Sequence, residues 1–166
     1  SALADTITLG ALVEVVGFVD SNGTDIITGF TSTTDDLAFG GITDITGAAG
    51  AAVTSGAFTA VSTNTVDNDI QIISDGADAL TAAGTEVILD YTNLTDVAAY
   101  LAEGFTSATD GDTVVFVIND LVGDKSYAYF YNEDVTNSTA VTAGDLALIG
   151  IITETNGVAL VSGDSA

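Results

Sequence analysis

The chain has 166 residues and a mass of 16.6 kDa, and its 24 Asp and Glu residues stand against one basic residue, Lys125, for a formal net charge of −23. It contains no Cys, His, Met, Trp or Pro. This composition excludes disulfides, thiolate nucleophiles, imidazole bases and the zinc, haem and iron–sulfur sites that Cys and His ordinarily build. One basic residue cannot neutralise a row of phosphates, so we expect neither nucleic acid nor an anionic membrane as a partner.

The length and hydrophobic content predict one folded domain that spans residues 1–166. Hydrophobic residues make up 47% of the chain and the mean hydropathy is +0.48, whereas disordered acidic chains are poor in apolar residues. The apolar runs are far shorter than the roughly 20 residues of a membrane-spanning helix, so we expect no membrane insertion. Residues 1–5 lack the basic region and apolar core that mark a secretory signal peptide.

The predicted elements begin with residues 1–16, an extended N-terminal segment. Two interpretations are open: it is the first strand of its own domain, or it is a strand used in contacts between subunits. Further strands are predicted in stretches rich in β-branched and aromatic residues, at 12–19, 25–30, 66–73, 86–91, 113–119, 126–132, 146–153 and 158–161. The segment 40–60 is rich in Gly, Ala, Ser and Thr and is either a long surface loop or a pair of strands.

One helix is predicted between Asn93, a suitable N-cap, and Gly104, a suitable stop. The apolar side chains between them recur at the i, i+3, i+4 and i+7 spacing of one helix face: Leu94, Val97, Ala98 and Leu101. A second, weaker helical pattern covers residues 77–83. Together these elements predict a mainly β fold, an antiparallel β-sandwich or β-roll-like single domain with one or two short helices.

Two further patterns bear on the architecture. The alternation in residues 127–131 places Tyr127, Tyr129 and Tyr131 on one face of a strand, with Ala128 and Phe130 on the other. The tyrosine face is either packed on the core or a neighbouring subunit, or it binds a sugar or a partner, and packing is the favoured interpretation. No period of 20–50 residues repeats convincingly along the chain.

Oxygen-bearing side chains one or two residues apart, often around a Gly, suit a hard cation such as Ca²⁺, which collects about six to eight oxygens. Asx-Gly is also the commonest turn chemistry, so each such cluster is either a solvated turn or a cation site. Because the carboxylates of so acidic a chain repel one another, we expect at least one bound Ca²⁺. The predicted ligands are Asp20, Asn22, Asp25, Asp35, Asp36, Asp67, Asp69, Asp110, Asp112 and Asp134.

We expect no enzymatic activity. Carboxylate pairs serve as acid and base in glycoside cleavage, but Asp-rich loops provide such pairs by chance, and the chain has no Trp to form a sugar platform. Triplets such as Ser162-Gly163-Asp164 lack a partner base.

Several stretches resemble a known group of proteins. Residues 25–30 (DIITGF) and 36–39 (DLAF) are similar to an element found downstream of RTX repeats in type I-secreted bacterial proteins. Residues 111–116 (GDTVVF), 126–130 (SYAYF) and 145–150 (DLALIG) are similar to a second run in the same tails. The group includes the serralysin C-terminal region and the tails of surface-layer proteins and adhesins. The chain departs from it in having no tandem glycine-rich nonapeptides, and residues 40–45 form at most one degenerate copy.

The resemblance implies export without an N-terminal signal peptide, an extracellular or cell-surface location and Ca²⁺-dependent folding or assembly. The export signal of the group would fall near residues 158–161. On this basis we expect a secreted structural protein that self-assembles into a filament, surface layer or biofilm matrix, with Ca²⁺ bridging its carboxylates. Its main partner is then another copy of itself, with cell-surface polysaccharide as a further candidate.

Two alternatives remain open. In one, the chain is a monomeric Ca²⁺-binding adhesin or carbohydrate-binding module of a type I-secreted protein, stabilised by Ca²⁺ without polymerising. In the other, the acidic surface serves solubility in brine, and any salt stabilises the protein without preference for Ca²⁺.

Overall fold

The computed structural model describes residues 3–19, 23–42, 54–56, 64–66, 69–75, 90–107, 113–120, 124–133, 140–155 and 160. Its helix, α1, covers Leu94–Gly104. Its strands are β1 Thr6–Thr8, β2 Val15–Val19, β3 Asp25–Phe30, β4 Asp36–Gly41, β5 Thr54–Gly56, β6 Asn64–Val66, β7 Asp69–Asp75, β8 Phe105–Ser107, β9 Thr113–Asp120, β10 Lys125–Asn132 and β11 Leu146–Glu154. The described residues contain no helix that is long and apolar enough to span a membrane.

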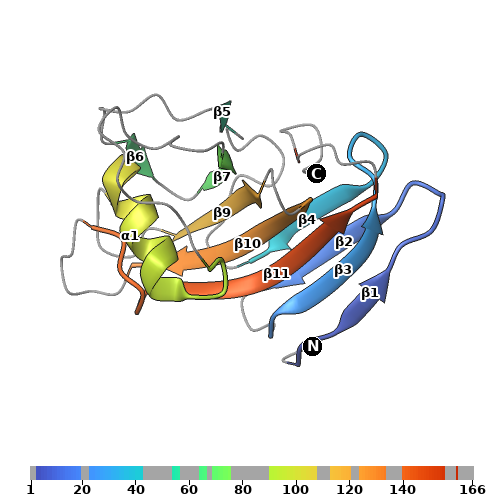
Figure 1. Ribbon diagram of the computed structural model, residues 1–166, viewed down its shortest axis with the longest axis horizontal. Coiled ribbons are helices and arrows are strands. Elements are labelled where there is room, and N and C mark those ends of the chain that lie inside the picture. The colour runs from blue at the N-terminus through green and yellow to red at the C-terminus, as the bar shows by residue number, and fades with distance from the viewer. Residues whose placement is uncertain are drawn as a thin grey trace.

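A seven-stranded sheet in the order β1-β3-β11-β10-β9-β7-β5 forms the centre of the molecule (Figure 1). Two smaller pairs, β2–β4 and β6–β8, complete the described strands. The predicted mainly β domain with a short helix is confirmed. The prediction of antiparallel pairing holds for β9–β10 and β10–β11, but it is wrong for the other described pairs, which are all parallel.

The two N-terminal parallel pairs, β1–β3 and β2–β4, arise because the chain changes layer between successive strands. After β1 it passes to β2 in the small sheet, returns to β3 beside β1, and then passes to β4 beside β2. The connection that contains Asn22-Gly23, a dipeptide that favours hairpins, therefore joins strands of different sheets. Parallel neighbours need such a crossover connection, and a turn residue alone does not show which sheet the next strand enters.

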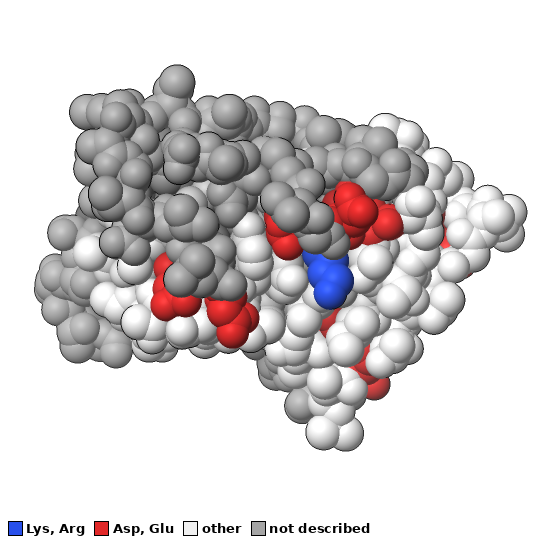
Figure 2. Space-filling model, in the orientation of Figure 1, with Lys and Arg blue, Asp and Glu red and all other residues white. Residues whose placement is uncertain are grey.

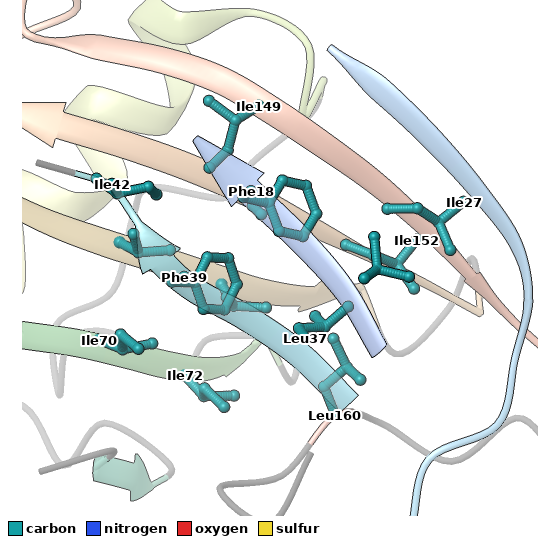
Figure 3. Packing of buried hydrophobic residues seen from close by; sticks show 14 of the residues in the cluster. Phe18, Ile27, Leu37, Phe39, Ile42, Ile70, Ile72, Ile149, Ile152 and Leu160 are labelled. Atoms are coloured by element: carbon teal, nitrogen blue, oxygen red, sulfur yellow. The ribbon is translucent and has the colours of Figure 1, made fainter. Parts of the chain in front are cut away.

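Apolar side chains fill both faces of the large sheet. On one face, α1 packs over a cluster that includes Ile73, Phe116 and Tyr129. On the other face, the β2–β4 pair covers a second cluster, in which Phe18 and Phe39 lie over Ile149 and Ile152 of β11 (Figure 3). The central strand β9 is buried on both sides, which explains its uninterrupted apolar sequence.

Helix α1 forms as its sequence predicts. The Asn93 side chain accepts a hydrogen bond from the Thr95 N–H at 3.1 Å, and Asp96 lies in the first turn, where a negative charge is favourable. Val97 and Leu101 face the core, while Ala99 is exposed. The helix ends at Gly104, and the Phe105 N–H closes it by donating to the Leu101 carbonyl.

The first four strands form two stacked units, which we call the first rung (β1 and β2) and the second rung (β3 and β4). Equivalent residues lie 20 or 21 positions apart, and the Thr8 and Thr28 hydroxyls are 3.1 Å apart across β1 and β3. Phe18 and Phe39 stack across β2 and β4 with ring centroids 5.1 Å apart. The motif Asp-x-Ile-Thr therefore occurs twice, at residues 5–8 and 25–28, a spacing of 20 residues that lies within the range of 20–50 residues in which no convincing repeat was expected.

The structure agrees with some of the predicted strands and differs from others. The strands predicted at 25–30, 113–119, 126–132 and 146–153 coincide with β3, β9, β10 and β11 to within a residue. Residues 90 and 91, the described end of the strand predicted at 86–91, form a turn before α1 instead. The helix expected at 77–83 and most of the strand expected at 158–161 lie outside the described residues, and of segment 40–60 the structure describes 40–42 and β5.

Candidate functional site

Asp25 and Asp35, two of the predicted Ca²⁺ ligands, are buried and accept backbone hydrogen bonds. Asp25, the first residue of β3, accepts from the Asp5 N–H at 2.9 Å. Asp35 is only 1% exposed, and its two oxygens accept from the Glu14 N–H at 3.1 Å and the Thr31 N–H at 2.9 Å. Both carboxylates thus join the first rung to the second, a role that the sequence does not predict.

The other predicted ligands are distributed along the chain. Asp36 begins β4 and is half-buried, and Asp69 begins β7 beside Val114 of β9. Asp25 begins β3 and Asp35 follows its other end, so the structure does not bring these two together. Asp20, Asn22, Asp67, Asp110, Asp112 and Asp134 lie outside the described residues. Within the described ranges, no three acidic side chains converge as a metal site would require, and Ca²⁺ binding stays a prediction.

Glu14 is a residue with a defined role that the sequence analysis did not single out. Its Oε2 accepts from the Gly10 N–H at 2.6 Å, four residues earlier, as Asp35 accepts from Thr31. The other Asp35 oxygen accepts from the backbone N–H of Glu14, the residue that precedes β2. The sequence signal for this role of Glu14 was its spacing, because Gly10 precedes Glu14 by four residues as Thr31 precedes Asp35.

Strand β1 forms one edge of the seven-stranded sheet. It pairs with β3 on its inner side, and among the described residues no strand pairs with its outer side. Residues 6–13, which include β1, contain no charged side chain. Edge strands avoid pairing with another molecule by being very short or by carrying Lys, other charges or Pro. Strand β1 is three residues long and carries no charged residue or Pro.

Exposed apolar side chains gather in the same N-terminal region. All the large hydrophobic residues that the described part of the chain exposes lie between residues 3 and 26, and Leu12 is 77% exposed. They are Leu3, Leu12, Val13, Val15, Val19 and Ile26. Leu3, Leu12 and Val13 flank β1 in the chain, Val15 and Val19 belong to β2, and Ile26 belongs to β3. Clustered exposure of this kind is typical of an interaction surface.

Figure 2 shows one face of the molecule, on which carboxylates form small separate groups with uncharged surface between them. Lys125, the single basic residue, lies against one of these groups. Among the residues that the structure describes, the carboxylates on this face therefore form several separate groups of negative charge.

The tyrosine face of β10 belongs to the core, in agreement with the favoured interpretation. The ring of Tyr127 stacks on Tyr91 with centroids 4.6 Å apart, and the Tyr129 hydroxyl donates to the Tyr91 carbonyl at 2.6 Å. Burial raises the pKa of the Tyr129 hydroxyl far above its usual value, and burial together with the charge of Asp120 raises that of Tyr127. Ala128 and Phe130 face the opposite cluster, as predicted.

A buried polar group lies where β9, β10 and β11 meet. The Ser126 hydroxyl oxygen is 2.7 Å from both Asn119 Oδ1 and Glu154 Oε1. Asn119 also donates through Nδ2 to the Leu160 carbonyl at 3.0 Å. Ser126 and Asn119 are fully buried, and Glu154 is 7% exposed. Enclosed in this way, the three side chains stabilise the sheet and are closed to a substrate.

The geometry thus offers two surface features, an uncharged sheet edge with apolar neighbours and a large number of carboxylates. No protein-family description, curated protein or solved structure matches this chain.

Proposed function

We propose that the protein is an extracellular structural subunit that assembles with copies of itself, with Ca²⁺ bridging carboxylates between subunits. The observation that carries the proposal is the β1 edge, which is unpaired among the described residues and carries no charged side chain. Charged side chains or Pro on an edge strand usually prevent pairing with another molecule, and β1 has neither. The sequence resemblance to surface-layer and adhesin tails supports the extracellular location.

Charge determines the conditions for assembly. With a net charge of −23, copies of the chain repel one another at low ionic strength. Divalent cations that bind carboxylates of two subunits remove this repulsion and add a link, whereas monovalent salt only screens it. The proposal therefore makes large assemblies dependent on Ca²⁺ rather than on ionic strength.

The test is sedimentation velocity together with negative-stain microscopy of the purified chain in about 5 mM CaCl₂, in excess chelator, and in NaCl of the same ionic strength. We expect filaments or sheets in Ca²⁺ alone, and their dissolution by chelator. Particles of one small size under all three conditions, with a higher melting temperature in Ca²⁺, would favour the Ca²⁺-binding adhesin or carbohydrate-binding module. Equal stabilisation by NaCl and CaCl₂ would favour an acidic surface adapted to brine.

A further inference from the structure

We propose that two copies of the chain join through their β1 edges, strand beside antiparallel strand, so that one continuous sheet runs through the dimer. Thr6 of each copy then lies opposite Thr8 of the other, and the two Ile7 residues lie at the two-fold axis. This inference rests on the proposed self-assembly and specifies its first contact.

The backbone of β1 has the groups for this pairing in the required places. Toward β3, the Asp5 carbonyl accepts from the Ile26 N–H, and the Leu9 N–H donates to the Thr28 carbonyl, both at 2.8 Å. Successive residues of a strand direct their N–H and C=O groups to opposite sides. The odd-numbered residues of β1 therefore bond to β3, and Thr6 and Thr8 direct their backbone groups to the open edge.

The sequence of β1 is the same in both directions, Thr-Ile-Thr. An antiparallel pair centred on Ile7 places Thr6 opposite Thr8 of the second copy, and each such pair exchanges both of its backbone hydrogen bonds. Cross-strand Thr–Thr pairs are favourable. In the same register Asp5 lies opposite Leu9 of the second copy, so like charges do not meet across the strands.

A second copy suits this edge better than a differently charged partner. A basic partner would be attracted to the carboxylates elsewhere on the surface, whereas residues 6–13 give it no charge to pair with. For a molecule that repels its own copies, an uncharged edge is the place of closest approach.

Pairing through one shared edge closes on itself and yields a dimer, not a filament. It needs backbone hydrogen bonds and apolar contacts but no cation. We therefore expect a dimer that persists in chelator, and Ca²⁺-dependent contacts that join such dimers into larger assemblies. The two levels are separable by experiment.

A first test places a charge on the edge. Thr6→Lys puts an ammonium group beside the open backbone and also lowers the net negative charge, which by itself would promote association. In chelator, we expect the parent chain to sediment as a dimer and Thr6→Lys as a monomer. Ala99→Lys, on the exposed face of α1, makes the same change of charge and should remain dimeric. Equal behaviour of the two variants would overturn the inference.

The decisive test is disulfide formation between two single-cysteine variants, because the chain has no cysteine of its own. In the proposed register, the Cα atoms of Thr6 and of Thr8 of the second copy are about 5.5 Å apart, within reach of a disulfide. Mildly oxidised in chelator, an equilibrated mixture of Thr6→Cys and Thr8→Cys should give a covalent dimer that contains one copy of each. Either variant alone should remain uncrosslinked, since identical positions in the two copies lie beyond about 7 Å.

The outcomes distinguish this inference from the proposed function. Ca²⁺-dependent polymers without the mixed crosslink would overturn the β1 pairing and leave the structural function in place. A crosslink within Thr6→Cys alone would show a different register and would also overturn it. Absence of any association, with or without Ca²⁺, would overturn both.

Discussion

The Ser126 hydroxyl illustrates how a single proton constrains its neighbours. The hydroxyl has one hydrogen, yet its oxygen lies 2.7 Å from two acceptors, Asn119 Oδ1 and Glu154 Oε1. The Leu160 carbonyl fixes the orientation of the Asn119 amide, because a flipped amide would place oxygen against oxygen. The one hydroxyl hydrogen is therefore shared between Asn119 Oδ1 and Glu154 Oε1, both of which accept from Ser126.

Two substitutions test this arrangement. Ser126→Ala removes the hydroxyl from both partners, and we expect unfolding to become easier by about 1–3 kcal/mol, because two buried acceptors lose their contact. Glu154→Gln keeps an oxygen that accepts from Ser126 in a side chain of nearly the same size, and we expect the free energy of unfolding at pH 7 to change by less than about 1 kcal/mol. Both are measured by urea denaturation. A loss in Glu154→Gln as large as that in Ser126→Ala would contradict the hydroxyl contacts as the source of the stabilisation.

At the scale of the element, strand β10 connects the two faces of the sheet. Its tyrosines pack toward α1 and the turn before that helix, while Ala128 packs toward the β2–β4 pair. The Tyr129 hydroxyl donates to the Tyr91 carbonyl, so this contact requires a protonated phenol. The packing of α1 against the sheet is thereby linked to the ionisation of a side chain.

This linkage predicts a loss of stability at alkaline pH. Burial raises the pKa of Tyr129 and Tyr127 above the value near 10 of an unfolded chain. The contribution of a raised pKa is complete below the unfolded value and is lost as pH rises above it. The unfolding free energy should therefore be steady from pH 7 to 9 and then fall above about pH 10, by up to about 1.4 kcal/mol per pH unit for Tyr129.

Tyr129→Phe provides the control for the loss of stability at alkaline pH. The substitution lowers the free energy of unfolding by about 1 kcal/mol at neutral pH through loss of the hydrogen bond to Tyr91. Above pH 10, however, the free energy of unfolding of the variant should fall less steeply than that of the parent chain. The chain has no Cys or His, so the other side chains that titrate in this range are four tyrosines and Lys125, and the difference between the two slopes isolates Tyr129. Chemical denaturation monitored by circular dichroism measures both slopes, and identical slopes for the parent and the variant would contradict the assignment.

The elements that the sequence predicts well are those whose signals are local. The N-cap at Asn93 and the apolar face of α1 lie within a few residues of each other, as do the alternating side chains of β10. Contacts between strands that are distant in the chain are not predicted by such local signals. Asp25 resembles a cation ligand in isolation, but its hydrogen-bond partner is the backbone of Asp5, 20 residues earlier, and only the parallel β1–β3 pairing brings the two together. Register between distant strands is not encoded in the spacing of one turn.

For the whole molecule, the contact between the layers depends on Gly150 of β11. The structure places the Phe18 ring against this residue, and a Cβ there would come within 2.7 Å of the ring. Phe18 is buried and stacked on Phe39, so it has little freedom to move away. The register of β10 and β11 also shifts beside this residue, where Ala128 faces Gly150 and Tyr129 faces Leu148.

Gly150→Ala should therefore destabilise the protein by about 1–3 kcal/mol, as overpacking of a filled core does. Gly144→Ala is a matched control, because the nearest neighbour of its Cβ, the Thr142 hydroxyl oxygen, is at an ordinary distance of 3.7 Å. Thermal unfolding of the two variants measures the difference. A Gly150→Ala variant as stable as the control would show that the β2–β4 pair adjusts freely over the large sheet.

The position of β3 between β1 and β11 has a consequence for the order of folding. Thr24 donates to the Leu148 carbonyl, and the Thr31 and Thr155 hydroxyls meet at 3.0 Å, each across 124 positions of the chain. A chain made from its N-terminus onward holds both rungs without this neighbour until β11 has been synthesised. Contacts at such separation close slowly, because loop closure costs entropy before the strands gain their bonds. The part of the chain that is made first is thus among the last to become stable.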